Sequence, residues 1–331
     1  MSFSIFTHVL HTIEKEKFVA YAPYIREMNI WLKHVGKVEI VAPLKKCSTI
    51  EVNGGEYYQH QKLVFSAIPS VHLLTFKSIS SSFWKLPLIF LKVFNSMLRA
   101  EHVHLRCPGN IGLIGCLLQI FFPHKPKTAK YAGNWDPEAK QPWSYKLQKW
   151  ILSNTILTRN MTVLVYGKWP NQTKNILPFF TASFKESEKE VVIKDFKSPY
   201  KFLFVGGLVI GKQPSFAIKL VEALNNRSIP AEIHIYGDGP LKNDLEKVAK
   251  NKDYIHLHGN QPLDVLKQHY KDAHFLILAS KSEGWPKAVA EAMFFGCIPI
   301  ATAVSCVPWM LAAPPPPKGE AKMSPLLKGG F

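Results

Sequence analysis

The chain has 331 residues, of which 47% are hydrophobic and 20% charged. This composition excludes an intrinsically disordered protein and is sufficient for two domains with buried cores. The formal net charge is +17, and residues 1–180 hold 22 Lys and Arg against 9 Asp and Glu, whereas the remaining residues hold 19 against 15. We therefore expect the N-terminal half to contact an anionic partner: nucleic acid, an anionic membrane surface or a phosphorylated substrate.

The cysteines and the apolar segments bear on the cellular compartment. The chain has no C-x-x-C pair, and most of its five cysteines lie in apolar stretches (Cys47, Cys107, Cys116, Cys297 and Cys306). This pattern predicts buried free thiols in a reducing compartment and no metal site. The start lacks a signal-peptide layout, and the longest apolar run, Ile111–Pro123, is too short to cross a bilayer. The expected location is cytoplasmic, with peripheral binding to the inner face of the cell membrane left open.

The first 180 residues alternate between apolar runs of strand length and segments of helical period. The predicted strands are Ser4–Val9, Val38–Val41, Val71–Phe76, His102–Arg106, Thr128–Ala132 and Thr162–Val165. The predicted helices are Ala22–Lys33, Phe83–Arg99, Ile111–Phe122 and Tyr145–Ser153. Buried strands that alternate with amphipathic helices predict an α/β domain with a parallel sheet covered on both faces.

The alternation stops in the polar segment 181–199, which is dense in Lys and Glu and is predicted to connect two domains. It then restarts with five predicted strands, Lys201–Val205, Glu232–Tyr236, Tyr254–Leu257, His274–Leu278 and Ile298–Ala301. Helices are predicted between them at Ser215–Asn225, Leu241–Lys250, Leu263–Tyr270 and Lys287–Phe295. We expect two Rossmann-like domains, residues 1–180 and 200–311, that face each other across a cleft.

The last twenty residues differ from everything before them. After a short helical start at Val307–Leu311, residues 312–331 contain four consecutive prolines and are rich in Lys, Gly and Pro. Such a run forms neither a helix nor a central strand, so we predict a disordered tail.

Two glutamates carry the strongest chemical signal, because Glu283 and Glu291 lie eight positions apart around a Gly-Trp-Pro turn. Pro286 suits the first turn of a helix, whose backbone N–H groups near Lys287 and Ala288 would then point at an anion. Glu291, about one turn further, would accept hydrogen bonds from a ribose diol. The spacing alone also fits an amphipathic helix with surface glutamates.

This segment resembles the E-x7-E motif of the group 1 retaining glycosyltransferases, which have the GT-B fold. In that family the first Glu lies beside the donor sugar and the second binds the nucleotide ribose. The resemblance therefore implies these roles for Glu283 and Glu291. The donor site that it implies also includes the turn and the helix start, Gly284, Trp285, Pro286, Lys287 and Ala288.

A second segment, KFLFVGGLVIGK from Lys201, resembles the strand, glycine loop and lysine of the same family. The resemblance implies that Gly206 and Gly207 allow a close approach of the donor diphosphate and that Lys212 neutralises it. The family often has an arginine where this chain has Gly207, so one expected phosphate contact is absent. A glycine pair and a lysine alone would be weak evidence.

Two more segments match the family in the same order. Ile233–Glu246 matches a strand, a glycine turn and a helix, and we interpret its glycines as turn residues. The following match ends at Gly259 and Asn260, where the family's loop meets the nucleobase largely through backbone atoms. His256 and His258 share a strand face but have no carboxylate cluster nearby in the sequence, so we interpret them as structural rather than as a metal pair.

The N-terminal half matches the family less well. His102–Arg106 resembles a strand that the family carries toward the cleft, and polar residues also follow the next predicted strand. Because open parallel sheets bind ligands at the carboxyl ends of their strands, Arg106, Asn134 and Asp136 are candidates for acceptor-side catalytic residues. Ordinary loop structure is the alternative, and His11 is a weaker candidate.

The resemblance implies transfer of a sugar from a nucleoside-diphosphate sugar to a glycan or lipid-linked acceptor hydroxyl, with retention. The pathway would be the synthesis of a glycan or a cell-envelope polysaccharide. Lys212 and the helix after Pro286 would stabilise the leaving diphosphate, and neither a metal ion nor another cofactor is expected. No nucleic-acid-binding module is present in the sequence, so we expect no nucleic-acid partner.

Two alternatives stay open. The first alternative is a truncated, non-catalytic nucleotide-sugar-binding protein, because the GT-B donor domain usually continues beyond the position of Leu311 and ends in a helix that returns to the first domain. The second alternative is a GT-B sugar-nucleotide epimerase.

The segment Ser82–Arg99 has two interpretations. It sets many apolar residues among Lys85, Lys92 and Arg99, and it is either a helix buried against the sheet or a membrane-binding helix.

Overall fold

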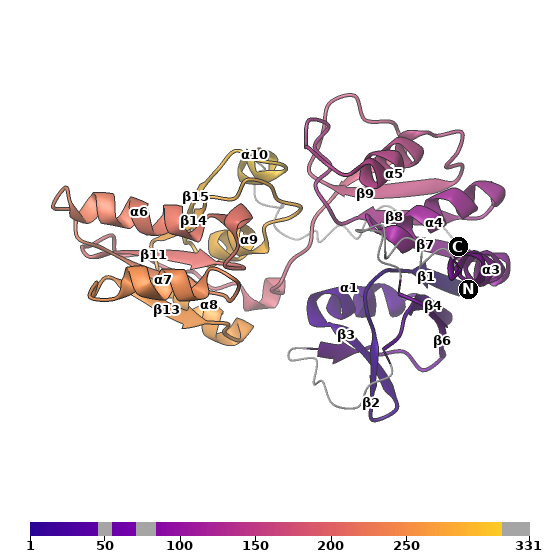
Figure 1. Ribbon diagram of the computed structural model, residues 1–331, viewed down its shortest axis with the longest axis horizontal. Helices are drawn as coiled ribbons and strands as arrows, with labels where there is room; N and C mark the ends of the chain where they lie inside the picture. Colours follow the sequence, from indigo (N-terminus) through magenta and orange to yellow (C-terminus); the bar gives the residue numbers. More distant parts are fainter. Residues whose placement is uncertain (46–54, 71–83, 313–331) are drawn as a thin grey trace.

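Two parallel sheets organise the computed structural model, which describes residues 1–45, 55–70 and 84–312 (Figure 1). The first has the order β10-β9-β8-β7-β1-β4-β6. Its strands are β1 (Ser2–Phe6), β4 (Lys37–Pro43), β6 (Leu63–Ile68), β7 (His102–Cys107), β8 (Lys127–Tyr131), β9 (Met161–Tyr166) and β10 (Ile176–Phe179). The second has the order β13-β12-β11-β14-β15. Its strands are β11 (Tyr200–Val205), β12 (Ala231–Tyr236), β13 (Ile255–Gly259), β14 (Phe275–Leu278) and β15 (Ile298–Ala301).

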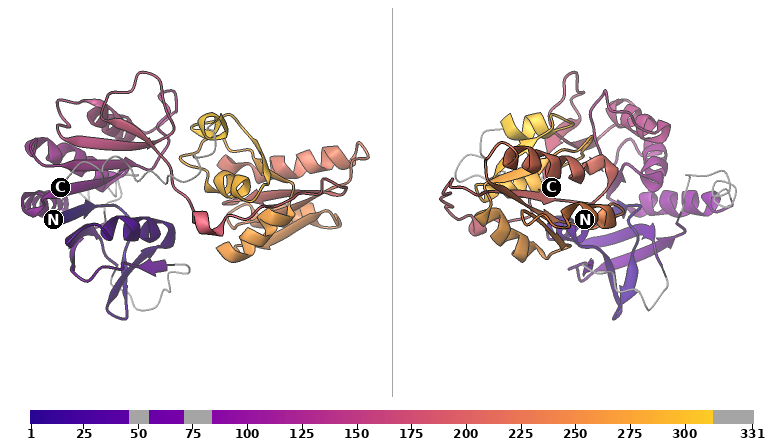
Figure 2. Two further views of the ribbon diagram at one scale, coloured as in Figure 1. Left: turned by 180° about the vertical axis from the view of Figure 1, so that it is seen from behind. Right: turned by 60° about the vertical axis from the view of Figure 1, so that its left-hand side comes forward.

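All strand pairs within these two sheets are parallel, as the alternation of strands and helices predicted. Each sheet has helices on both faces, because its strands carry apolar residues on both sides. Figures 1 and 2 show the result as two α/β lobes that lie side by side. The α/β class with two Rossmann-like domains is therefore confirmed.

The first lobe holds α3 (Leu86–Arg99), α4 (Asn110–Leu118) and α5 (Trp143–Ser153) on one face of its sheet and α1 (Ala22–Leu32) on the other. A short 3-10 helix, η1 (Gln119–Phe121), extends α4, so the predicted helix Ile111–Phe122 is two consecutive elements. None of the helices in the described part of the chain is long and apolar enough to span a membrane.

Several elements of the first lobe were not predicted. A small antiparallel sheet is formed by β2 (Thr12–Glu14), β3 (Lys17–Tyr21) and β5 (Gly55–Tyr57). Strands of three to five residues with exposed positions carry too little apolar pattern to be recognised. The edge strands β6 and β10 were also missed, and the predicted strand Val71–Phe76 lies outside the described residues. The first predicted strand was placed too late, because β1 ends at Phe6.

In the second lobe, α6 (Pro214–Asn225) and α7 (Lys242–Ala249) pack on one face of the sheet. The other face is covered by α8 (Leu263–Asp272), α9 (Lys287–Phe294) and α10 (Val307–Ala312). All five predicted strands and all four predicted helices of this half overlap observed elements. Ala312, predicted to begin the disordered tail, is instead the last residue of α10, and the rest of that tail lies outside the described residues.

The polar connection between the lobes, which includes the 3-10 helix η2 (Glu186–Glu188), packs on the second lobe. Phe184 is buried against Phe295 at the end of α9. The Lys194 ammonium donates hydrogen bonds to three carbonyl groups at the end of α8, those of Tyr270, Lys271 and Ala273. Lysine at a helix C-terminus satisfies carbonyls that have no intrahelical partner. These contacts fix the conformation of the connection against α8 and α9 of the second lobe.

Candidate functional site

The two sheets each have a point where the strand order reverses. In the second sheet β11 lies between β12 and β14, and in the first β1 lies between β4 and β7. Ligands of open parallel sheets bind outside the carboxyl ends of the strands at such a point. The loops that follow β11 and β14 carry Lys212 and Glu283, and Arg106 lies near the end of β7. Candidates chosen from the sequence therefore lie at both switch points.

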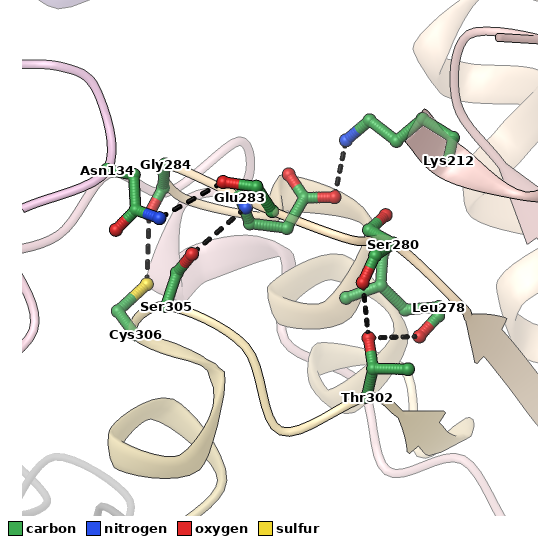
Figure 3. Close-up of polar contacts among 10 residues, drawn as sticks. Asn134, Lys212, Leu278, Ser280, Glu283, Gly284, Thr302, Ser305 and Cys306 are labelled. Carbon is green, nitrogen blue, oxygen red and sulfur yellow. Dashed lines mark hydrogen bonds and ion pairs between the residues drawn. The ribbon is translucent and has the colours of Figure 1, made fainter. Parts of the chain in front are cut away.

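Lys212 and Glu283 form the central contact of the second lobe. The Lys212 Nζ donates to Glu283 Oε1 at 2.5 Å, and Figure 3 shows the two side chains pointing toward each other. The Glu283 side chain is only 6% exposed, whereas that of Lys212 is 32% exposed. A buried carboxylate requires such a partner, since an unpaired charge there would be costly. The ammonium has two further N–H donors for a ligand.

Backbone contacts hold the Glu283 segment in place. Lys281 N–H donates to the carbonyl of Gly211 at 2.9 Å, which ties this segment to the glycine loop. Glu283 N–H donates to the hydroxyl of Ser305 at 3.0 Å, and the Cys306 thiol donates to the Gly284 carbonyl at 3.0 Å (Figure 3). The loop after β15 therefore positions Glu283. Ser305 was missed in the sequence, where a serine in a loop carries no signal of its own.

The glycine loops leave open space above the strand ends. A methyl group added at Gly206 or Gly259 would meet no atom within 4 Å, so a ligand has room to approach both backbones. Gly237 is different: its φ is 142°, and an added Cβ would lie 1.9 Å from the Gly206 carbonyl oxygen. This agrees with its interpretation as a turn residue. A cavity of about 230 Å³ borders Gly237, His258 and Gly259.

Glu291 is buried in α9 and already accepts two hydrogen bonds. Its Oε1 accepts from the hydroxyl of Ser183, which lies in the connection between the lobes, and its Oε2 accepts from the Tyr270 hydroxyl at 2.9 Å. Burial, and then the Glu291 carboxylate, raise the pKa of Tyr270 well above its ordinary value, so this hydroxyl keeps its proton. A carboxylate has about four acceptor positions, so two are left for a ribose diol.

The Gly-Trp-Pro turn lies against the first lobe. The Trp285 ring stacks on Tyr166 with centroids 5.6 Å apart, and its indole N–H donates to the Thr181 carbonyl at 2.8 Å. A Cβ at Gly284 would be 3.0 Å from the carbonyl oxygen of Ala132. Pro286 is buried and is the N-cap of α9, one position before the first turn predicted for it. The indole N–H of Trp285 is thus occupied by the protein.

A cluster of charged side chains faces the start of α9 from the first lobe. Lys130 in β8 is fully buried and pairs with Glu27 of α1, and its ammonium lies 4.5 Å from the centre of the Phe179 ring. Burial lowers the pKa of Lys130 to about 8; Glu27 opposes this shift, while Arg106 and Lys287 add to it. Burial likewise lowers the pKa of Lys287, the first residue of α9. Arg106 and Lys287 therefore lie within electrostatic range of the ion pair between Lys130 and Glu27.

Arg106 contributes an unused donor to this cluster. Its guanidinium stacks over the ring of Tyr24 at 4.7 Å, and its buried Nη1 has no hydrogen-bond partner among the described residues. Buried donors without a partner are rare and mark positions where a ligand or an ion can bind. Lys130 was missed as a site residue, although a lysine inside a predicted buried strand was a visible signal.

The remaining acceptor-side candidates differ from one another. Asn134 joins the lobes, since its Nδ2 donates to the hydroxyl of Ser282 at 3.0 Å (Figure 3). The Asp136 carboxylate accepts from the Glu138 N–H at 2.9 Å and so stabilises its own turn. His11 is buried and hydrogen-bonded to Val9 and Tyr58, as expected for a structural residue.

Two donor-side candidates, Gly207 and Asn260, are exposed at the ends of β11 and β13. No hydrogen bond of the Asn260 side chain appears among the described contacts. Together with Lys212, Lys287 and Glu291, they border the carboxyl edge of the second sheet. The structure thus places these donor-side candidates along one sheet edge, and Asn134 contacts Ser282 from the other lobe.

Comparison with known proteins bears on the family of the second lobe and on the fold of the chain. Residues 185–313 match the family model described as glycosyl transferases group 1. No match was found among curated protein sequences. Among solved structures, the chain is similar to the apo form of the lipopolysaccharide outer core galactosyltransferase WaaB, with 15% identity, a TM-score of 0.60, and coverage of 95% of this chain and 84% of that one.

Two further structures have a comparable likeness. WaaG, a glycosyltransferase involved in lipopolysaccharide biosynthesis, has 12% identity and a TM-score of 0.57, with 94% of this chain and 84% of that one covered. The sucrose-phosphate synthase of Thermosynechococcus elongatus has 14% identity and a TM-score of 0.56, with 92% and 82% covered. At such identities the likeness is one of fold. Residues 185–313 belong to the group 1 family of glycosyl transferases, and the chain has the GT-B fold.

Proposed function

We propose that this glycosyltransferase moves a sugar from a nucleoside-diphosphate sugar to an acceptor hydroxyl with retention of the anomeric configuration. The contact between Lys212 and Glu283 carries this proposal. It sets a cation and a buried carboxylate side by side at the switch point of the second sheet, beside two glycine backbones with open space above them. This arrangement suits a sugar joined to a diphosphate.

The chemical difficulty is the negative charge that builds on the leaving diphosphate. Lys212 has free N–H donors, and the first backbone N–H groups of α9, near Lys287 and Ala288, have no acceptors one helical turn before them. Charge stabilisation of this kind, fixed before the reaction, is a large part of most enzymatic rate enhancements. Glu283 would hold the sugar hydroxyls, and Glu291 would hold the ribose with the acceptor positions that Ser183 and Tyr270 leave unused.

The acceptor would bind on the first lobe. Arg106 offers an unpaired buried donor, and Lys130 and Lys287 add positive charge around Glu27. We propose a glycan or lipid-linked acceptor, in the synthesis of a glycan or a cell-envelope polysaccharide. The enzymes of lipopolysaccharide synthesis with a similar fold support this choice of pathway.

The test is a panel of UDP-, GDP- and ADP-sugars, with thermal shift measured first and released nucleoside diphosphate measured next. Release that requires an acceptor supports transfer, and the anomeric configuration of the product by NMR decides between retention and inversion. Release without any acceptor supports an epimerase or a hydrolase. Binding without release supports a non-catalytic nucleotide-sugar-binding protein. A chain that none of these donors stabilises contradicts the proposal.

The outer face of α3 favours peripheral binding to an anionic membrane that carries the acceptor. Ile89, Val93 and Met97 are buried, but Leu88, Leu91 and Leu98 are 47%, 61% and 53% exposed along one stripe. One side of α3 is thus buried against the sheet, and the other side exposes an apolar stripe. Its lysine and arginine residues border the stripe, as in interfacial helices. Sedimentation with anionic liposomes at low salt tests this, and absence of binding contradicts it.

A further inference from the structure

Four polar side chains share one face of β12 and β13, away from the donor site. Glu232 and His234 lie two residues apart on β12, and His256 and His258 lie two apart on β13, with His234 directly opposite His256. Alternate residues of a strand point to the same side of the sheet. The opposite side carries Ile233 and its neighbours, which pack against α6 in the core.

The side chains of Glu232, His234 and His256 converge on one point. Glu232 Oε1 lies 3.4 Å from His234 Nε2, and Glu232 Oε2 lies 3.9 Å from His256 Nε2. One ligand atom from each residue can be chosen so that all three lie within 4.8 Å of one another. In a tetrahedral zinc site with bonds of about 2.0–2.1 Å, ligand atoms are about 3.3 Å apart. Small side-chain rotations would therefore close the set around one ion.

The second nitrogen of His234 is also engaged. Its Nδ1 lies 3.0 Å from His258 Nε2, in hydrogen-bonding contact, while its Nε2 faces Glu232. The His234 ring also stacks on His256, with centroids 4.6 Å apart. Metal-binding histidines characteristically use the other ring nitrogen in a hydrogen bond that fixes the orientation of the ring. His234 is therefore held in the orientation that a ligand requires.

We propose that Glu232, His234 and His256 bind one divalent transition-metal ion of the zinc class. Two imidazoles and a carboxylate suit such an ion, and the three residues are partly exposed, which leaves a coordination position for water. Gly237 directly follows β12 and Gly259 ends β13 at the donor edge, beyond the cluster. The ion would thus join the edge strand β13 to β12 and would not contact the donor diphosphate.

This proposal differs from the interpretation of His256 and His258 as structural residues, which rested on the lack of a nearby carboxylate cluster in the sequence. The carboxylate, Glu232, is separated from His256 in the sequence and is brought beside it by strand pairing. One cation opposes metal binding: Lys201 of β11 has its Nζ 3.5 Å from Glu232 Oε1. A set of stacked histidines that serves only to pack the sheet would have no specific affinity for zinc.

Titration of the full chain with Zn²⁺ in a calorimeter tests the proposal, with Co²⁺ as a spectroscopic probe of tetrahedral coordination. We expect one ion per chain and a rise of the melting temperature on addition of Zn²⁺. Glu232→Gln and His256→Gln should each weaken Zn²⁺ binding by at least about tenfold and abolish the thermal shift. Lys201→Met should strengthen Zn²⁺ binding, because it removes the competing ammonium.

Two matched controls separate the cluster from other histidines. His269→Gln alters a ring of α8 that lies beside His258, and His124→Gln alters an exposed histidine of the first lobe. Both should bind Zn²⁺ as the unaltered chain does. No saturable Zn²⁺ binding, binding unchanged in Glu232→Gln and His256→Gln, or an equal loss in the two controls would overturn the site. None of these results depends on sugar transfer.

Discussion

The two lobes share an architecture but present different chemistry at their switch points. At the second sheet the site is built from glycine backbones, the start of a helix, and the paired side chains of Lys212 and Glu283. At the first sheet it is built from side chains alone, with Arg106 and Lys130 reaching the edge from neighbouring strands and Glu27 from a helix.

This difference explains why one half of the sequence was easier to interpret than the other. A diphosphate and a ribose are the same in every donor, and backbone amides at a glycine loop bind them with few side chains. The residues involved are close together in the chain, so they leave a local motif. Side chains that meet only across strands and helices leave no such motif, and the proposed acceptor site is therefore less visible in the sequence.

The largest effect is expected for Gly237→Ala, which tests whether the second lobe depends on close backbone contact. The new Cβ would lie 1.9 Å from the Gly206 carbonyl oxygen at a positive φ. We expect a loss of at least about 3 kcal/mol in the free energy of unfolding. Gly211→Ala, which meets no atom within 4 Å, is the control in urea denaturation. Equal stability of the two variants would contradict this account.

Lys212→Ala should weaken binding of the donor by about 1.5–3 kcal/mol, since it removes a charge-assisted contact with the diphosphate. Glu291→Ala should have a similar effect through the ribose, without unfolding the chain. Lys219→Ala on the exposed face of α6 is the matched control for a lost lysine. Calorimetry with the donor selected by the panel measures all three. Unchanged affinity in Lys212→Ala would remove it from the donor site.

Arg106→Gln tests whether the first lobe binds the acceptor. If its free Nη1 binds the acceptor, the variant should lose about 1.5 kcal/mol or more in kcat/KM for the acceptor while its affinity for the donor stays unchanged. Lys212→Ala should show the opposite result, a loss of affinity for the donor with unchanged affinity for the acceptor. Equal losses of donor and acceptor affinity in Arg106→Gln would mean that the two lobes do not divide the substrates in this way.

The last prediction concerns the pH dependence of stability. Burial lowers the pKa of Lys130 to about 8 from its ordinary value of 10.5. Between pH 8 and 10.5 the Lys130 side chain is protonated in the unfolded chain and neutral in the folded one. The free energy of unfolding therefore rises with pH in this range, by at most about 1.4 kcal/mol per pH unit. The contribution of Lys130 is complete above 10.5 and is lost as the pH falls through 8. Lys130→Met should show a smaller rise than the unaltered chain in denaturation between pH 8 and 10, and equal slopes would contradict the shift.

Much of the second lobe could be predicted because its local and global patterns agree. Apolar strand runs, amphipathic helices and glycine turns follow each other at regular intervals, and all five strands and four helices were anticipated. In the first lobe β2, β3 and β5 were missed because their pairing partners, not their own patterns, hold them in strand conformation. The edge strand β10 was missed for the same reason.

Within the candidate site, the identity of Lys212, Glu283 and Glu291 could be inferred, but not their partners. Ser183 and Tyr270 meet Glu291 from a connection and a helix that are far from it in the chain. Trp285, predicted to contact the donor, stacks on Tyr166 of the other lobe. A side chain's partner depends on how the lobes and helices pack, and no local pattern records this.

The sequence by itself determined the alternation of strands and helices and the positions of the glycine loops, because periodicity and backbone freedom are local properties of the chain. Only the tertiary structure decided the strand order and, with it, which loops became neighbours. That order brought Lys212 to Glu283 across 71 positions of sequence and Glu232 to His256 across two strands. Contacts between distant residues depend on the packing of the whole sheet, and so they emerge only when the chain is folded.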